Sequence, residues 1–161
     1  MVIPRLEDER VYLRPPTPSD VADIREISFY DGHAAESTEE ALAMLERIEE
    51  DVARGESVHW GVFLQGTDTC VGTCGFYRGF AEGTGEIGYV MRERFRGQGI
   101  MTAAVTLVVA HGFRGMGLER IVADVAPDNE ASTRLLERLG FRLEREVDGH
   151  RRYTLAPPSA P

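Results

Sequence analysis

The most constraining feature of this sequence is a glycine-bearing turn between a strand-like run and a long apolar segment. The run Glu86–Met91 is rich in β-branched and aromatic residues, and the segment from Ile100 continues without proline or charge to His111. This order predicts a strand, a loop and a helix. Gly97 and Gly99 permit positive φ angles, so successive loop N–H groups can converge on an anion. Because a helix start adds unpaired N–H groups and partial positive charge, the pattern indicates a phosphate site.

The loop lacks the residues of the two most common phosphate motifs. A Walker loop requires Gly-x-x-x-x-Gly-Lys followed by Ser or Thr, and no such lysine is present. A dinucleotide fingerprint requires Gly-x-Gly-x-x-Gly, and Thr102 stands where the third glycine is needed. Arg94 and Arg96 add cationic side chains at the rim of the loop. The loop therefore indicates a pyrophosphate on a different ligand.

Two segments resemble one family. The hexamer Arg96–Met101 resembles the Arg/Gln-x-x-Gly-x-Gly/Ala acetyl-CoA signature of the GNAT N-acetyltransferase superfamily. The segment Asn129–Phe141 is similar to the Asn-x-x-Ser…Glu-x-x-Gly-Phe element of its RimJ/RimL-like branch, which acetylates ribosomal-protein N-termini. Arg10–Asp20 and Glu86–Tyr89 also resemble elements of that branch. The four elements occur in the family's order over about residues 5–155.

The resemblance implies an α/β (mixed α+β) fold. In this fold a mixed, mostly antiparallel sheet of about seven strands has helices on both faces and a V-shaped splay between its fourth and fifth strands. Residue patterns predict strands near 10–14, 58–64, 69–77, 84–91, 120–125, 141–147 and 150–155. They predict helices near 17–28, 38–54, 98–113 and 130–139. We expect a single domain over residues 1–155 and a disordered tail over 156–161.

The resemblance also implies residue roles. Glu86 is expected to act as the base that deprotonates an amine, or else to be an edge-of-sheet carboxylate paired with an arginine. Ser132 is expected to hydrogen-bond or protonate the leaving thiolate, or else to bond the backbone of its own helix. Asn129 can contact the pantetheine amide or cap the last helix. The expected cofactor-binding residues are Tyr89, Val90, Met91, Arg94, Arg96, Gly97, Gln98, Gly99, Ile100, Met101, Thr102, Asn129 and Ser132.

Composition excludes several classes of function. The chain has 161 residues, of which 42% are hydrophobic and 28% charged, as is usual for a globular domain. A net charge of −9 argues against a nucleic-acid partner and suits a cationic amine, although it also serves solubility. No apolar run reaches the roughly 18 residues of a membrane span, and the first ten residues carry no secretory segment. We therefore expect a cytoplasmic protein without a membrane partner.

Cysteine and histidine spacing predicts neither a disulfide nor a metal site. Cys70 and Cys74 fall in one predicted strand, where residues four apart share a face at a separation of about 13 Å. That separation is too long for a disulfide. The four histidines are scattered, so a structural zinc site is not expected.

The combined prediction is an acetyl-CoA-dependent N-acetyltransferase. It would move an acetyl group to a primary amine, either a protein N-terminus or a small-molecule amine, by direct transfer in a ternary complex. The alternative is a non-catalytic module that binds acyl-CoA. Analogy with the RimJ/RimL-like branch leaves a homodimer open, and no motif identifies the acceptor.

Overall fold

The computed structural model describes residues 2–159, so the expected tail at 156–161 lies partly outside the described residues. One sheet has the strand order β1-β2-β5-β6-β7-β8-β10-β9, and a separate hairpin pairs β3 with β4. The strands are β1 Leu6–Glu7, β2 Val11–Arg14, β3 Phe29–Tyr30, β4 His33–Ala34, β5 Val58–Leu64, β6 Cys70–Tyr77, β7 Thr84–Met91, β8 Arg120–Val125, β9 Arg142–Val147 and β10 His150–Leu155. The α-helices are α1 Val21–Ile24, α2 Thr38–Ala53, α3 Ile100–Arg114 and α4 Glu130–Arg138.

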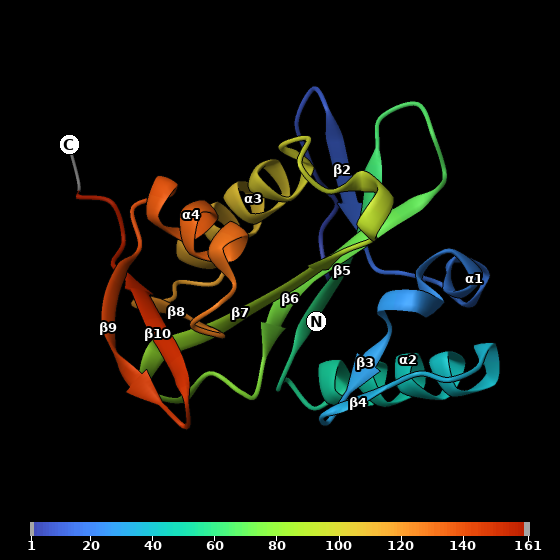
Figure 1. The fold of residues 1–161 in the computed structure, drawn as a ribbon, viewed down its shortest axis with the longest axis horizontal. Helices are drawn as coiled ribbons and strands as arrows, with labels where there is room; N and C mark the ends of the chain where they lie inside the picture. Colours follow the sequence, from blue (N-terminus) through green and yellow to red (C-terminus); the bar gives the residue numbers. More distant parts are fainter. Residues whose placement is uncertain (1, 160–161) are drawn as a thin grey trace.

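This architecture confirms the predicted fold class. The large sheet has eight strands rather than about seven because the two-residue strand β1 joins its edge. Its pairings are antiparallel except that of β7 with β8, which is parallel. Figure 1 shows α3 and α4 on one side of the sheet, and α1, α2 and the β3–β4 hairpin on the other. Within residues 2–159 no helix is both long and apolar enough to cross a membrane.

The prediction of one continuous helix over 17–28 is wrong. The segment consists of the short helix α1 between two 3₁₀ turns, Pro18–Asp20 and Arg25–Ile27. Asp20 accepts hydrogen bonds from the Thr17 backbone N–H and the Arg14 guanidinium, both at 2.8 Å. These bonds fix the first turn as a cap. The following residues, expected as a loop, form the hairpin of β3 and β4 instead.

The main core lies between the sheet and the helices α3 and α4. Its largest fully buried side chains include Trp60 on β5 and Phe76 on β6. Val105 and Val108 of α3 and Leu136 of α4 are also fully buried in this cluster. A buried side chain of this size contributes about 1.5–3 kcal/mol to folding. The core therefore fixes α3, and with it the glycine turn before α3, against the strands.

The expectation that Cys70 and Cys74 share one face of their strand is wrong. Cys74 belongs to the core under α3, whereas Cys70 packs with Phe63 on the opposite face of the sheet. The register between β5 and β6 shifts between Val62 and Phe63, and such an irregularity reverses the alternation of side chains. Both thiols are free and buried, and burial raises the pKa of each.

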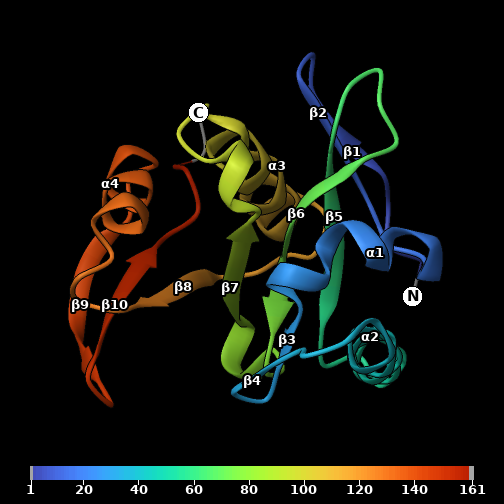
Figure 2. The ribbon, with the colours of Figure 1, turned by 45° about the vertical axis from the view of Figure 1, so that its right-hand side comes forward.

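The predicted splay lies between β7 and β8. These strands pair in parallel only at Thr84↔Arg120, Gly85↔Ile121 and Glu86↔Val122. Beyond Val122, β8 continues its pairing with β10 alone, up to Val125 opposite Arg151. Figure 2 shows β8, β9 and β10 turning away from β7. The sheet therefore opens at Glu86, between a first half that ends at β7 and a second half that begins at β8.

Candidate active site

The glycine turn connects the end of β7 to the start of α3. Gly97 and Gly99 have φ values of +76° and +77°, which side-chain-bearing residues adopt only with strain. Gly99 is the N-cap of α3, and the first intrahelical bond runs from the Ala103 N–H to the Gly99 carbonyl at 3.2 Å. The N–H groups of Ile100 to Thr102 therefore precede the helical bonding pattern. This geometry fits an anion at the helix start.

An arginine from the start of the sheet reaches the same turn. The Arg10 guanidinium donates a 2.7 Å hydrogen bond to the Gln98 carbonyl, and its Nη1 would lie 3.2 Å from a Cβ at Gly99. Arg96, expected at the rim, donates from Nε to the Met91 carbonyl at 3.0 Å and so ties the turn to β7. Arg10 therefore adds a cation beside the turn. No residue pattern in the sequence indicates this contact.

Met101 occupies the position where the acetyl-CoA signature has a small residue, and its side chain points into the core. It is buried, and its terminal methyl would lie 3.3 Å from a Cβ at Gly72 of β6. The glycine in the neighbouring strand thus makes room for the methionine. Only the backbone of Met101 faces the helix start. The methionine therefore does not block the N–H groups, although the acetyl-CoA signature has a small residue here.

Tyr89 and Ser132 meet across the opening of the sheet. The Tyr89 hydroxyl of β7 lies 2.5 Å from the hydroxyl of Ser132 in the first turn of α4. The Ser132 side chain therefore bonds a neighbouring strand rather than its own helix. Asn129 accepts a 3.1 Å bond from the Ser132 N–H and is the N-cap of α4, as one of its two readings predicted. Burial raises the pKa of Tyr89 to about 12, which keeps its phenol protonated at neutral pH.

Glu86 lies at the apex of the splay. Its side chain is on the face of β7 opposite to that of Ile87 and Met91, which belong to the core. Its Oε2 is 3.4 Å from Nε of Arg78, and its Oε1 is 3.6 Å from Nη2 of Arg152. The pairing with arginines, expected as the structural alternative, is therefore present. Burial nevertheless raises the pKa of Glu86, and although Arg78 opposes this rise, the nearby carboxylate of Asp124 adds to it.

Asp124 of β8 and Arg152 of β10 complete the charged cluster. Arg152 donates from Nε and Nη2 to the two Asp124 oxygens at 2.7 and 2.9 Å. This bidentate bond holds the pKa of Asp124 below its ordinary value. Neither residue was identified from the sequence, because their meeting with Glu86 depends on the register of three strands.

The Glu86 face of the sheet forms the floor of a groove with a volume of about 1020 Å³. The floor carries Glu86, Asp124 and Arg152. The opposite wall is largely apolar and comes from α1, its 3₁₀ extension, β3 and α2, with the lining residues Val21, Ile24, Ile27, Phe29, Met44, Leu45 and Ile48. The lining also includes the carboxylates Asp31, Asp51, Glu56 and Asp148, of which Asp51 and Glu56 pair with Arg54. The groove therefore combines an acidic mouth with an apolar wall.

The buried His59 and the half-buried Tyr77 form a pair at one end of this floor. Nδ1 of His59 is 2.6 Å from the Tyr77 hydroxyl. A Cβ at Gly75 or at Gly88 would lie within 3.2 Å of the Tyr77 side chain, so both glycines make room for the ring. Burial lowers the pKa of His59 to about 4, and the imidazole is therefore neutral at physiological pH. A neutral Nδ1 can accept a hydrogen bond from the Tyr77 hydroxyl, whose oxygen can still accept a further hydrogen bond.

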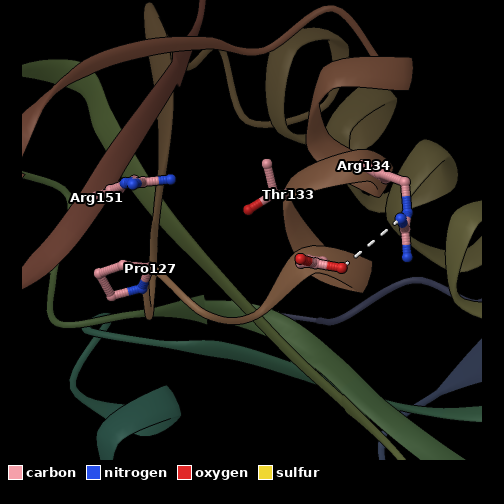
Figure 3. Close-up of a pocket in the computed structure, with 5 residues that line it drawn as sticks. Pro127, Thr133, Arg134 and Arg151 are labelled. Carbon is pink, nitrogen blue, oxygen red and sulfur yellow. Dashed lines mark ion pairs between the residues drawn. The ribbon is translucent and has the colours of Figure 1, made fainter.

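A second, smaller hollow of about 320 Å³ lies beside α4. Figure 3 shows Thr133 and Arg151 facing each other across it, and Arg134, which also lines it, lies 4.0 Å from Glu130. None of the residues predicted for catalysis or cofactor binding lines this hollow. Among the described residues, no group of three His, Cys, Asp or Glu side chains could hold a metal ion.

Comparison with known proteins agrees with this arrangement. Residues 10–142 match the model of the acetyltransferase (GNAT) domain family. The uncharacterized N-acetyltransferase YoaA of Bacillus subtilis (strain 168) is 34% identical over 152 residues, which are 89% of this chain and 85% of YoaA.

Two solved structures share the fold at low sequence identity. RimJ of Mycobacterium smegmatis, in complex with CoA-disulfide, superposes with a TM-score of 0.79 at 23% identity, over 96% of this chain and 86% of RimJ. An acetyltransferase from Agrobacterium tumefaciens superposes with a TM-score of 0.81 at 22% identity, over 98% and 96% of the two chains. The family match spans most of the chain and includes both the glycine turn and the α4 segment, and this chain therefore belongs to the GNAT family of N-acetyltransferases.

Proposed function

We propose that this chain transfers the acetyl group of acetyl-CoA to a primary amine by direct transfer in a ternary complex. The observation that carries the proposal is the position of strand β7. Its Glu86 end faces the acidic groove, and its Met91 end leads into the glycine turn at the start of α3. Two substrates could thus approach the opening of the sheet from opposite sides.

The donor side suits the pyrophosphate and pantetheine of CoA. N–H groups of the turn from Gly97 to Thr102 would bind the pyrophosphate, with Arg10 and Arg94 as nearby cations. Asn129 and the opened edge of β7, including Tyr89, Val90 and Met91, would hold the pantetheine arm. RimJ of M. smegmatis, which has the same fold, was solved with CoA-disulfide. The acetyl group enters the reaction as a thioester, an activated acyl donor.

The proposed chemistry uses groups on both sides of the opening. Glu86, directly or through water, accepts a proton from the acceptor amine, whose nitrogen lone pair then forms the bond to the acetyl carbon. The carbon–sulfur bond breaks, and the sulfur leaves with the electron pair. The Tyr89–Ser132 pair donates a hydrogen bond to this sulfur, which finally takes up a proton. An acceptor that starts as an ammonium ion therefore releases one proton overall.

The lining of the groove favours one kind of acceptor. Asp31 and Asp148 at its mouth, which unlike Asp51 and Glu56 are not paired with Arg54, attract a cation. Its apolar wall, which includes Ile27, Phe29 and Ile48, gains free energy by covering an apolar group, at about 0.8 kcal/mol for each buried CH₂. We infer an acceptor whose amine is attached close to an apolar group, such as a hydrophobic N-terminal residue, rather than a polyamine or an aminoglycoside.

An acceptor screen tests the proposed function. Acetyl-CoA is mixed with N-terminal peptides, polyamines and aminoglycosides, and free thiol is monitored together with the acetylated product. We expect turnover with a peptide or other apolar amine, and at least a hundredfold loss of kcat in Glu86→Gln with unchanged CoA affinity. If CoA binds but no amine is acetylated, the chain is a non-catalytic binding module.

A further inference from the structure

Three neighbouring strands bring Glu86, Asp124 and Arg152 together on the groove face of the sheet. Glu86 is opposite Val122 in the last pairing of β7 with β8, and Asp124 lies two residues farther along β8. Side chains two apart on a strand share a face, so Asp124 points to the same side as Glu86. Arg152 is the direct partner of Asp124 on β10. All three line the groove.

The arginine is bound far more closely to one carboxylate than to the other. Its two bonds to Asp124 measure 2.7 and 2.9 Å, whereas its nearest approach to Glu86 is 3.6 Å. The exposed fractions of the three side chains are 19–20%, so solvent screens this cluster only in part. Asp124 therefore carries a fixed negative charge, while Glu86 is held only loosely by Arg152 and by Arg78, which is 81% exposed.

A fixed negative charge beside a second carboxylate disfavours ionisation of that second group. A carboxylate that binds a proton more tightly is a stronger base towards an amine. Arg152 donates to both Asp124 oxygens and lowers the pKa of that carboxyl, so a proton shared by the two neighbouring carboxyls resides on Glu86. The two carboxylates thus differ in role although both face the groove.

We propose that Asp124, held ionised by Arg152, is a positioning residue that makes Glu86 the stronger base toward the acceptor amine. The inference rests on the proposed function, because the basicity of Glu86 matters only if an amine is deprotonated in this groove. It assigns a role to two residues that no motif in the sequence marks. Glu86 takes the amine proton, and Asp124 and Arg152 keep their protonation states throughout.

Other charged or titratable side chains face the same space and belong to any test by pH. Tyr77, beside Glu86 on β6, has a pKa raised by burial and stays neutral. Arg78 follows β6 and contacts Glu86 directly. The groove is also lined by side chains of the hairpin, of α2 and its end, of β5 and of the β9–β10 turn, namely Tyr30, Asp31, Asp51, Arg54, Glu56, His59, Asp148 and His150.

The test is the pH dependence of kcat/KM in Asp124→Asn, measured with the acceptor found in the screen. The variant keeps an oxygen for Arg152 and removes the negative charge. Arg152 then keeps only one of its two bonds to residue 124 and can approach Glu86 more closely. The loss of the negative charge and the closer arginine both favour the ionised form of Glu86. We expect the acidic limb of the profile to move to lower pH and the plateau to fall about tenfold. Both proteins are also measured with His150→Gln, so that the rim imidazole does not contribute.

Two further variants separate this role from a structural one. Glu144→Gln is the matched control, since Arg120 binds Glu144 at 2.8 and 3.0 Å on β8 and β9, outside the groove lining. It is expected to leave the pH profile in place. Arg152→Lys, which keeps the charge and one hydrogen bond, is expected to give a profile between those of wild type and Asp124→Asn. Thermal unfolding verifies that each variant is folded.

The outcomes are distinguishable. If Glu86→Gln is inactive and Asp124→Asn lowers the plateau without moving the acidic limb, the positioning role is wrong while the proposed function stands. If Glu86→Gln retains wild-type kcat, the base assignment fails and the inference fails with it. In the Glu86→Gln background, Asp124→Asn should add no further loss, because both substitutions act on one proton transfer. Additive losses in that background would also contradict the inference.

Discussion

The phenolic oxygen of Tyr89 lies 2.5 Å from the hydroxyl oxygen of Ser132, and this contact joins β7 to α4 across the opening of the sheet. A serine hydroxyl alone is a weak acid. Burial raises the pKa of the Tyr89 phenol to about 12, so the phenol stays protonated at neutral pH. The Ser132 hydroxyl bonded to it is therefore part of a donor pair. Whether the two hydroxyls act as one pair can be tested by substitution.

We predict that Ser132→Ala and Tyr89→Phe each lower kcat by about 10- to 100-fold, because each breaks the donor pair whose hydrogen bond to the developing anion is worth about 1.5–3 kcal/mol. Single-turnover measurement of thiol release reports the step directly. The double variant should be no slower than the slower single variant. Thr133→Val, in the same helix turn, is the control and should keep wild-type kcat. Independent, multiplying losses would show that the two hydroxyls do not act as a pair.

Gly97→Ala should weaken CoA binding as well as stability. With φ at +76° and nothing within 4 Å of an added Cβ, the substitution costs backbone strain alone, about 1–2 kcal/mol. Gly117→Ala has φ at +70° and equally open space, so it matches the strain at a site after α3. Calorimetric titration with CoA should show about tenfold weaker binding for Gly97→Ala only. Equal affinities in the two variants would argue against anion binding by this turn.

Asp20 should stabilise the protein in a pH-dependent manner. Burial alone would raise the pKa of Asp20, but hydrogen bonds from Arg14 and Thr17 outweigh it and the pKa is lowered. The stabilisation is therefore complete above the ordinary value of 3.8 and is lost as the pH falls through the lower folded-state value. Asp20→Asn should lower the free energy of unfolding by about 2 kcal/mol at neutral pH. Urea unfolding at several pH values should show this difference shrinking in acid, whereas exposed Asp128→Asn should show little difference throughout.

The apolar wall of the groove predicts acceptor selectivity. Phe29→Ala should raise KM about three- to tenfold for an acceptor with an apolar group near its amine, because part of the covering surface is lost. Leu143→Ala is a matched control, since both side chains are 57% exposed and only Phe29 lines the groove. Initial rates with paired peptides that begin with a hydrophobic or a polar residue test this prediction. An unchanged ratio of kcat/KM between the two peptides would exclude contact with Phe29.

Much of the fold could be predicted because its signals are local. Strand runs, the cap Asn129 and the glycine turn all depend on neighbouring residues, and most predicted strand boundaries agree within one residue. The broken helix after Thr17 was not predicted, because the segment changes to a 3₁₀ turn at Arg25–Ile27 and no residue pattern marks that change. The homodimer and the domain limits stay predictions.

The site was predicted less completely because it depends on register. Glu86, Tyr89 and Ser132 could be named from family resemblance, and Tyr89 and Ser132 do meet. Asp124 and Arg152 carry no motif, and only the pairing of β8 with β10 places them beside each other. Arg10 reaches Gln98 across 88 residues of sequence, and no local pattern indicates such a contact.

The three-pair ladder between β7 and β8 also makes the site sensitive to geometry at a distance. Glu86 and Tyr89 belong to the first half of the sheet, whereas Asp124 and Ser132 belong to the second half. Any change in the angle between the halves alters the Glu86–Asp124 and Tyr89–Ser132 separations together. In Gly85→Ala, for example, the added Cβ would lie 2.7 Å from Leu118 and would force the strands to shift. Such a substitution would impair proton acceptance and thiolate release together, without contacting either substrate.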